Sequence, residues 1–204
     1  MLVQDDASRR AMKILCNPRL YSALFLKILS KDGKLVPFVW NRCQRIIYEH
    51  MLWAQRNGLP QFFLILKPRQ IGSTTLAEAL GFHATATVPG FRARTLAHDK
   101  ETTREIFEKC HVFYENLPLW MRPELATNNI SRLVYPALKS RYMIGTAGTK
   151  AGAGVGRTIN FVHCSEVGKY PEGGYELISA LEECVPINNG IAIYESTAYT
   201  TDGW

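Results

Sequence analysis

Residues 62–75 read FFLILKPRQIGSTT, and this stretch decides the fold of the chain. Residues 62–66 form the longest uninterrupted apolar run, which is typical of a short strand covered on both faces in a parallel sheet. A loop containing Gly72 follows, and a helical pattern begins at about Thr74. A strand, a glycine-containing loop and a helix in this order direct backbone N–H groups and a helix N-terminus toward one point. Such a point binds an anion, phosphate above all.

The same alternation continues along the rest of the chain. Apolar runs predict further strands at residues 94–98, 142–146, 159–164 and 191–195. The spacing of apolar residues predicts helices at residues 8–30, 41–55, 74–86, 100–117 and 175–184. Residues 118–139 are expected to be irregular or to form a small hairpin. Short apolar strands that alternate with helices predict an α/β domain with a mostly parallel sheet.

Length and composition bound the class of protein. The chain has 204 residues, of which 47% are hydrophobic, and this is enough for one well-packed domain. No apolar run approaches the roughly 20 residues of a membrane helix, and the N-terminal sequence MLVQDDASRR lacks the apolar core of a signal peptide. The five cysteines include no CxxC pair, which disfavours a zinc ribbon and fits thiols in a reducing compartment. We therefore expect a soluble intracellular protein.

The net charge of +6 is unevenly distributed along the sequence. Residues 1–60 contain ten basic and four acidic residues. Residues 61–120 carry a surplus of one positive charge, and residues 121–204 a surplus of one negative charge. The basic N-terminal part is either a solvated helix face or a contact with a polyanion or a neighbouring subunit. The predicted sheet domain is itself nearly neutral.

The loop at residues 67–74 departs from the phosphate-loop pattern GxxxxGK[ST] at two positions. Gly72 and Thr74 match the last glycine and the hydroxyl residue, but Ser73 occupies the lysine position and Lys67 the position of the first glycine. Phosphate needs a cation within reach rather than at a fixed position, so Lys67 and Arg69 can both serve if they turn inward. The alternative is a plain helix N-cap with the two basic residues as surface charges.

A second chemical signal follows the predicted strand at residues 159–164, which runs into Ser165 and Glu166. In phosphate-loop ATPases such a strand ends in two acids, of which the first supports Mg²⁺ and the second polarises the attacking water. Glu166 has the position of the water-activating acid. Ser165 stands where an aspartate is usual, so its contact with Mg²⁺ is expected through its hydroxyl or through water. The alternative is an ordinary exposed glutamate at a strand end.

Two further segments are weaker signals. Ser196, Thr197 and Ala198 follow the last predicted strand, where a hydroxyl can lie near the γ-phosphate or the attacking water. Strand-to-turn transitions are commonly rich in such residues, however. Phe38 and Gln44 precede the loop by about two elements and could stack on adenine and read its polar edge. The alternative for this pair is a core phenylalanine and a surface glutamine.

Taken in this order, these elements resemble the ATPase domain of the large terminase subunit of tailed bacteriophages, over about residues 30–204. The resemblance is carried by the KxRQxGxT loop, by the SE pair followed by Val167 and Tyr170, and by the ESTA segment at residues 195–198. It implies a P-loop NTPase fold of the ASCE, RecA-like class, with three α/β/α layers around a mostly parallel central sheet. The implied organisation is an N-terminal helical segment at residues 1–35 and an ATPase domain at residues 36–204.

The resemblance also implies a function. The family hydrolyses ATP with Mg²⁺ to drive double-stranded DNA into viral procapsids. Its expected partners are double-stranded DNA, the portal protein and the small terminase subunit, and its subunits assemble as a homo-oligomeric ring, whereas an isolated domain can be monomeric. The expected location is the host cell cytoplasm, without a membrane.

The roles of individual residues follow from the same resemblance. The phosphates are expected on Lys67, Pro68, Arg69, Gln70, Ile71, Gly72, Ser73, Thr74 and Thr75. Lys67 and Arg69 would assist catalysis there, and Arg69 would sense or stabilise the γ-phosphate. Thr74 would ligate Mg²⁺, and Ser165 would contact it through water.

The remaining roles lie outside the loop. Glu166 is the expected catalytic carboxylate, and Arg157 is either a finger reaching into a neighbouring subunit or an exposed loop arginine. Phe38 and Gln44 would recognise adenine. Ser196, Thr197 and Ala198 would couple hydrolysis to movement.

Complete large terminases continue into a metal-dependent nuclease domain, and we expect no nuclease activity from this chain because few acidic residues follow Glu195. Two rival functions stay open. One is a helicase-like ATPase fragment, and the other is a non-catalytic nucleic-acid or capsid-assembly module with a degenerate phosphate loop.

Overall fold

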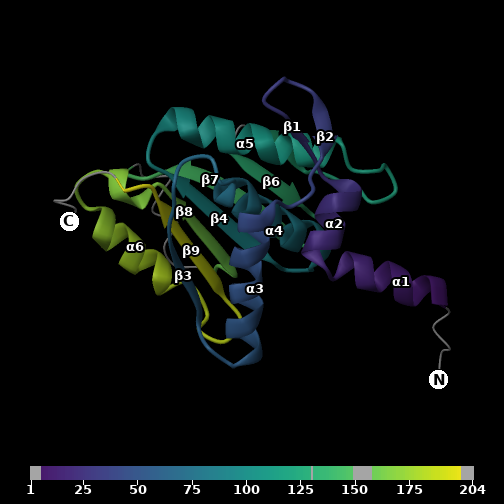
Figure 1. Ribbon diagram of the computed structural model, residues 1–204, viewed down its shortest axis with the longest axis horizontal. Coiled ribbons are helices and arrows are strands. Elements are labelled where there is room, and N and C mark those ends of the chain that lie inside the picture. Colours follow the sequence, from purple (N-terminus) through teal and green to yellow (C-terminus); the bar gives the residue numbers. More distant parts are fainter. Residues whose placement is uncertain (1–5, 130, 149–157, 199–204) are drawn as a thin grey trace.

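The computed structural model describes residues 6–129, 131–148 and 158–198, and its described part is built around one large sheet (Figure 1). Within these residues seven strands pair in the order β3-β9-β8-β4-β7-β6-β5. The first five are parallel to their neighbours, and β6 and β5 extend the sheet as an antiparallel hairpin. Their bounds are β3 Gln61–Leu66, β9 Ile191–Ser196, β8 Phe161–Ser165, β4 Arg92–Ala97, β7 Ser140–Thr146, β6 Arg132–Tyr135 and β5 Thr127–Asn129.

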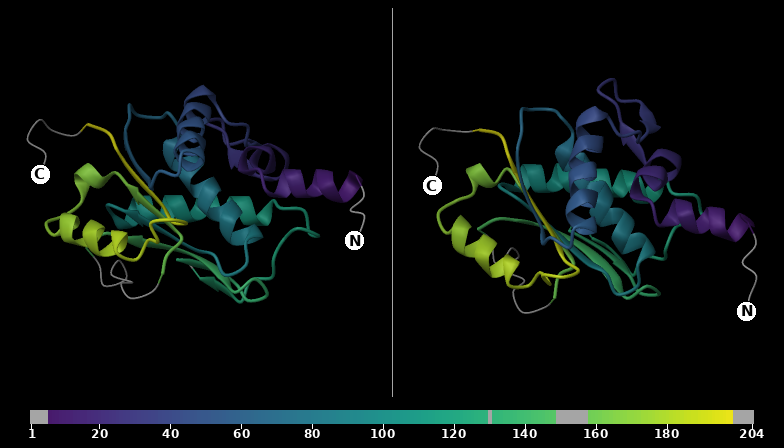
Figure 2. Two further views of the ribbon diagram at one scale, coloured as in Figure 1. Left: turned by 90° about the horizontal axis from the view of Figure 1, so that it is seen from below. Right: turned by 60° about the horizontal axis from the view of Figure 1, so that its bottom comes forward.

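Helices cover both faces of the sheet. One face packs against α3 (Arg42–Arg56), α4 (Ser73–Thr87) and α5 (Lys100–Glu115), and the other against α6 (Gly174–Glu182) (Figures 1 and 2). The strands alternate between the two cores: Phe161 lies in the core under α4, whereas its neighbour Val162 lies in the core under α6. The three-layer α/β/α arrangement with a mostly parallel sheet confirms the predicted fold class.

The prediction of one continuous helix over residues 8–30 is wrong. The chain forms α1 (Asp6–Leu15) and α2 (Pro18–Phe25), followed by a hairpin of β1 (Lys27–Leu29) and β2 (Leu35–Pro37). Pro18 begins α2 because it has no N–H to continue α1, and the Asn17 side chain accepts hydrogen bonds from two N–H groups of the new first turn.

The N-terminal elements are attached to the sheet domain unequally. Tyr21 of α2 and Leu26 are 1% exposed and belong to the same core as Phe82 of α4. In contrast, α1 has no buried residue and extends away from the sheet (Figure 2). The division between residues 35 and 36 stays a prediction.

Strand order has one consequence for the site. β3, which leads into the loop at residues 67–72, does not pair with β8, which carries Ser165; β9 lies between them. The carboxyl ends of all three strands therefore meet at one edge of the sheet.

Among the described helices none is both long and apolar enough to cross a membrane. All five cysteines are free thiols.

Candidate active site

The loop after β3 leaves the N-terminus of α4 open to an anion. Gly72 precedes the helix with φ +81°, and no side chain caps the first turn of α4 among the described residues. A Cβ atom on Gly72 would lie 2.7 Å from Gln44 Nε2, so both the backbone conformation and the space require glycine. The free N–H groups and the positive end of the helix dipole favour a negatively charged ligand here.

Lys67 turns into this site from the end of β3. Its side chain is 8% exposed, and Nζ lies 3.2 Å from Glu195 Oε1 and 3.3 Å from Glu166 Oε1. Nζ also donates a hydrogen bond of 3.2 Å to Thr74 Oγ1. The lysine thus lies between two carboxylates, directly beside the first turn of α4.

Glu166 follows β8 in a left-handed backbone conformation, with φ +55°. Its Oε2 accepts hydrogen bonds from the backbone N–H (3.3 Å) and the hydroxyl (2.9 Å) of Thr197. Burial would raise the pKa of Glu166, but the hydrogen bonds from Thr197 and the charge of Lys67 outweigh it and lower the pKa. Glu166 is therefore an ionised acceptor, and it is bonded directly to the predicted coupling segment.

Glu195 completes the site, and the sequence analysis assigned it no role. It is fully buried, accepts a short hydrogen bond from Thr74 Oγ1 and accepts another of 3.2 Å from Ser165 Oγ. Burial would raise its pKa, but the hydrogen bond and charge of His163, the charge of Lys67 and a hydrogen bond from the Ser73 hydroxyl together lower it. A single acid in the otherwise apolar run of β9 is the signal that could have identified it.

A buried chain of charges extends from Glu195 into the core. His163 of β8 lies between two carboxylates, with Nε2 3.3 Å from Glu195 Oε1 and Nδ1 2.6 Å from Glu78 Oε1 of α4. Tyr142 and Thr95 donate hydrogen bonds to Glu78 as well. Burial would lower the pKa of His163, but hydrogen bonds and charges of the two glutamates raise it to about 9.

The predicted adenine pair divides into two different environments. Gln44 is 3% exposed and forms a capping box with Asn41, and its Nε2 donates 2.8 Å to the Gly72 carbonyl. Asn41 Nδ2 donates 3.0 Å to the Ile71 carbonyl, so the start of α3 holds the loop in place. Phe38 is 2% exposed and stacks on Phe113 in the core, with ring centroids 6.1 Å apart. Its ring is therefore not presented to a base.

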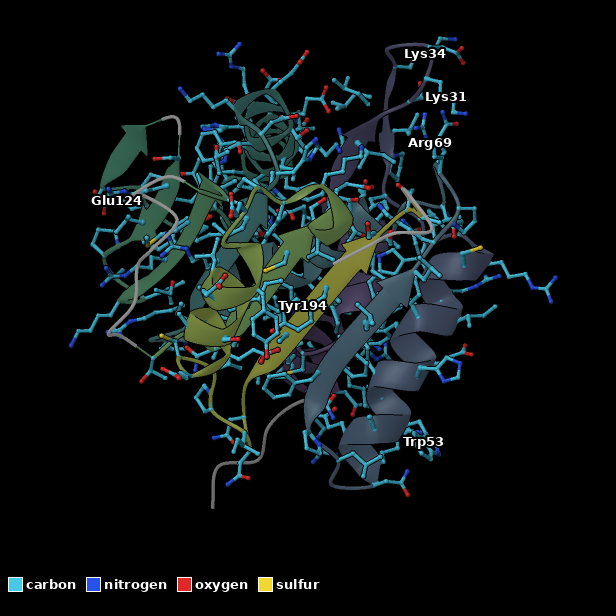
Figure 3. The ribbon with its side chains drawn as sticks, turned by 90° about the vertical axis from the view of Figure 1, so that its left-hand side faces the viewer. Lys31, Lys34, Trp53, Arg69, Glu124 and Tyr194 are labelled. Atoms are coloured by element: carbon cyan, nitrogen blue, oxygen red, sulfur yellow. The ribbon has the colours of Figure 1, made fainter. Side chains whose placement is uncertain are left out.

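The other predicted residues also differ in position. Arg69 is exposed and lies at one corner of the molecule near Lys31, which donates 3.0 Å to Gln70 Oε1 (Figure 3). Of the remaining loop residues, Pro68 is exposed, Thr75 is partly buried and Ser73 is buried. Of the coupling residues, Ala198 is exposed, and the Ser196 hydroxyl accepts a hydrogen bond from the Gly168 N–H. Arg157 lies outside the described residues.

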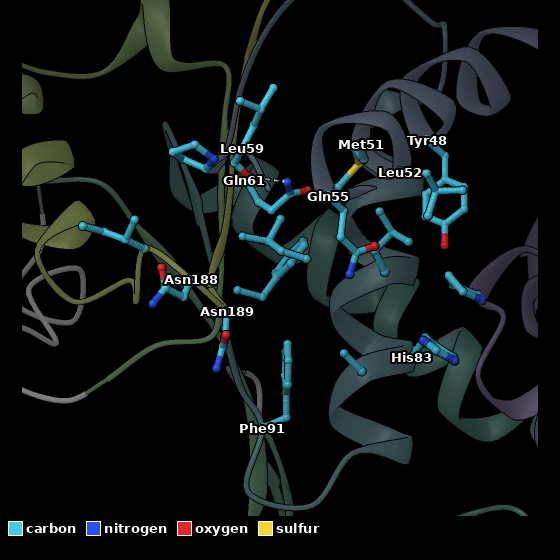
Figure 4. Close-up of a pocket in the computed structure, with 18 of the residues that line it drawn as sticks. Tyr48, Met51, Leu52, Gln55, Leu59, Gln61, His83, Phe91, Asn188 and Asn189 are labelled. Atoms are coloured by element: carbon cyan, nitrogen blue, oxygen red, sulfur yellow. Dashed lines mark hydrogen bonds between the residues drawn. The ribbon is translucent and has the colours of Figure 1, made fainter. Parts of the chain in front are cut away.

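A hollow of about 550 Å³ lies away from this site (Figure 4). It is bordered by Gln61 and Ile191, the first residues of β3 and β9, whereas Lys67 and Ser196 lie at the opposite ends of these strands. Apolar side chains of α3, such as Met51, and the amides of Gln55 and Asn188 line it. The described charged groups of the candidate active site do not reach it.

Comparison with solved structures identifies the fold. The large terminase of bacteriophage HK97 has a TM-score of 0.66 and 14% identity, over 89% of this chain and 37% of that one. The large terminase ATPase domain of Thermus phage P74-26 has a TM-score of 0.55 and 18% identity, over 75% of this chain and 66% of that one. This chain has the fold of a phage large terminase ATPase domain.

The terminase fold is also found in bacteriophage D6E, whose large terminase was solved in complex with ADP. That structure has a TM-score of 0.54 and 8% identity, over 76% of this chain and 38% of that one. No protein-family model and no curated protein matches the sequence. The chain spans less than two thirds of the length of each of the three solved structures.

We expect the stability of the protein to fall as the pH rises from 6.5 through 9, because the folded state holds a proton on His163. The unfolded state, with an ordinary histidine pKa of 6.5, releases that proton at lower pH. The protonated histidine thus contributes fully to the free energy of unfolding below pH 6.5, and this contribution, up to about 3 kcal/mol, is lost as the pH passes the folded pKa. Urea unfolding at several pH values measures this loss.

The buried Cys110 thiol also has a raised pKa, so it too makes the folded state less stable at high pH. The variant His163→Gln keeps this thiol and therefore serves as the control that isolates the contribution of His163. The difference in unfolding free energy between the wild type and this variant should shrink as the pH rises. A difference that is constant from pH 6.5 to 10 would contradict a protonated His163.

The burial of Phe38 predicts that it serves stability and not base binding. Phe38→Ala should lower the free energy of unfolding by about 3–5 kcal/mol, and Val39→Ala, at a neighbouring side chain that is 69% exposed, should change it little. Phe38→Leu should keep the nucleotide affinity of the wild type. Normal stability combined with weakened nucleotide binding in Phe38→Leu would instead support adenine stacking.

Proposed function

We propose that this chain is the ATP-hydrolysing motor domain of a DNA-packaging terminase. The observation that carries the proposal is the placement of Lys67, which lies between Glu166 and Glu195 and beside Thr74 at the open N-terminus of α4. The lysine comes from the start of the loop, as the terminase resemblance implies, and the fold is that of terminase ATPase domains. The ADP in the D6E terminase supports the choice of ligand.

In this proposal the β- and γ-phosphates bind at the first turn of α4. Backbone N–H groups of residues 70–74 donate to the phosphate oxygens, and Lys67 exchanges its ion pairs with the two glutamates for a pair with phosphate. Arg69 approaches from the exposed side of the loop. These groups bind and orient the reacting phosphate, which supplies most of the catalysis in phosphoryl transfer.

The residues present fit Mg²⁺, which prefers hydroxyl and carboxylate oxygens and takes its other ligands from phosphate and water. Within the described residues no group of three or more His, Cys, Asp or Glu side chains is placed to hold a metal ion. Thr74 and Ser165 offer hydroxyl oxygens at the loop and at the end of β8. When bound, the ion neutralises charge on the phosphates.

Glu166 is the group that orients and deprotonates the attacking water. It is ionised, lies at the edge of the site and is 15% exposed in its side chain. Its hydrogen bonds to Thr197 connect the state of the nucleotide to residues 196–198. Movement of Glu166 during turnover would therefore displace the coupling segment, through which hydrolysis would act on double-stranded DNA.

The proposed setting is the assembled packaging machine. The domain would work in a homo-oligomeric ring together with the portal protein and the small terminase subunit, in the host cytoplasm. Arg157 would then complete the site of a neighbouring subunit.

Phosphate release and nucleotide binding, both measured with Mg²⁺ and double-stranded DNA, test this proposal. Glu166→Gln should keep nucleotide affinity and lower turnover by about 10²–10⁴-fold, because it removes the group that handles the proton. Lys67→Ala should weaken nucleotide binding at least about tenfold, because it removes a phosphate cation. Lys13→Ala, which removes an exposed lysine of α1, is the control for loss of charge.

Equal phosphate release in all variants would contradict the motor function. Failure of the wild type to bind nucleotide at millimolar concentration would favour a non-catalytic assembly module.

A further inference from the structure

We propose that Glu195 of β9 is the carboxylate that supports Mg²⁺ in this site, in place of the acid that phosphate-loop ATPases carry at the end of the strand equivalent to β8. This assignment rests on the proposed function and names a residue of that same site. Its basis is the position of Glu195, its contacts with Thr74 and Ser165, and a buried oxygen atom that receives no well-formed hydrogen bond from the described residues.

The sheet register places Glu195 beside the substituted position. Ser165 of β8 and Glu195 of β9 are direct partners in the parallel pairing of the two strands. Both belong to the α4 side of the sheet, since Ser165 donates to Glu195 and Glu195 contacts Thr74 of α4. Because β9 lies between β8 and β3, a side chain from β9 begins one strand nearer to the loop than one from β8. A glutamate side chain is longer than that of the usual aspartate. From β9, its carboxylate can therefore reach the position that an aspartate on β8 would occupy.

The hydrogen bonds of Glu195 are those expected of the missing acid. In phosphate-loop enzymes the loop hydroxyl and the acid of the second motif together support the ion. Here the Thr74 hydroxyl donates to Glu195 Oε1. Ser165 uses its own hydroxyl as a donor to the same oxygen, at 3.2 Å. Ser165 thus acts as a positioning residue for the carboxylate in this site.

The second oxygen of Glu195 receives no well-formed hydrogen bond within the described residues, although the buried Ser73 hydroxyl lies close enough to the carboxylate to help lower its pKa. Oε1 receives contacts from Thr74, Ser165, Lys67 and His163, whereas no hydrogen bond of acceptable geometry reaches Oε2 from the described residues. The side chain is fully buried, and an ionised oxygen left unpaired in such a place is costly. A water molecule bound to Mg²⁺, or the ion itself, would satisfy it.

The charges around Lys67 also favour Glu195 as the carboxylate that supports Mg²⁺. Lys67 pairs with both Glu195 and Glu166, so its one positive charge offsets only part of their two negative charges. When Lys67 pairs with phosphate instead, His163 remains as the described cation within 3.3 Å of Glu195, but His163 is shared with Glu78. A divalent cation beside Glu195 would restore the balance, which links the binding of metal and nucleotide.

The test measures the affinity of a fluorescent ADP analogue with Mg²⁺ and with EDTA, so that its readout does not depend on turnover. In the wild type we expect Mg²⁺ to tighten binding at least tenfold. In Glu195→Gln, which keeps the shape of the side chain and removes its charge, this ratio should fall to within about twofold of one. The affinity measured in EDTA should be retained. Glu176→Gln, which removes the charge of an exposed glutamate on α6, is the matched control and should keep the full effect of Mg²⁺. Ser165→Ala, which removes the positioning hydroxyl, should weaken the effect less than Glu195→Gln does.

Two more variants make the result decisive. The double variant Ser165→Asp with Glu195→Gln, which returns the acid to β8, should recover the effect of Mg²⁺. If far-ultraviolet circular dichroism shows that Glu195→Gln does not fold, Glu195→Asp replaces it in the test. Aspartate keeps the negative charge, but its side chain is one carbon shorter, so the carboxylate lies farther from the ion. That variant should weaken the effect of Mg²⁺ by about tenfold.

The outcomes separate this assignment from the proposed function. A wild type that binds no nucleotide overturns the function and the assignment together. A wild type that binds nucleotide with Mg²⁺, while Glu195→Gln retains the full effect of the ion, overturns the assignment alone. Loss of the effect in Ser165→Ala but not in Glu195→Gln would return the metal contact to Ser165.

Discussion

A buried lysine held between two carboxylates is the interaction on which the rest of the site depends. Removing Lys67 from water costs several kcal/mol unless opposite charges and hydrogen bonds compensate it, and Glu166, Glu195 and Thr74 provide that compensation. These groups come from β3, α4, β9 and the turn after β8. The site therefore forms only when the parallel strands are in register and α4 begins at the end of the loop. We propose that the same lysine pairs with phosphate when a nucleotide binds.

The polar residues inside the sheet have a common role in this arrangement. Glu78, His163 and Glu195 form a buried chain that links α4, β8 and β9. Each group alone would be costly in the core, but together they alternate in charge, and Tyr142 and Thr95 donate further hydrogen bonds to the far glutamate. The chain fixes the position of Glu195 from behind, as Ser165 does from the side. Its rigidity is an advantage where a carboxylate must face a ligand in one orientation.

Local patterns predicted most of the elements. The apolar run at residues 62–66 and the helix after it lie within two residues of β3 and α4, because both signals are contained in a few neighbouring side chains. The prediction for residues 8–30 was wrong because Asn17 and Pro18 start a new helix and because the β1–β2 hairpin has little apolar alternation of its own. Such short elements are stabilised by tertiary contacts that a local pattern does not contain.

The candidate site was predicted in part for a similar reason. Lys67 and Glu166 directly follow recognisable strands, Thr74 lies at the start of the predicted helix, and the structure brings the three together. The lone acid of β9 marks Glu195 as a candidate, but the contacts of Glu195 and His163 could not be predicted, because their partners are 30 or more residues distant in sequence and depend on sheet register. Phe38 and Gln44 were predicted together as an adenine-recognition pair, but Phe38 packs in the core while Gln44 donates to the Gly72 carbonyl.

The most direct test of the central claim is a crystal structure of the protein with Mg²⁺ and a non-hydrolysable ATP analogue. We expect phosphate at the first turn of α4, with Lys67 Nζ within hydrogen-bond distance of a β- or γ-phosphate oxygen and displaced from at least one of its glutamates. A loop that stays empty at millimolar analogue, or a nucleotide bound while Lys67 keeps both carboxylate contacts, would contradict it.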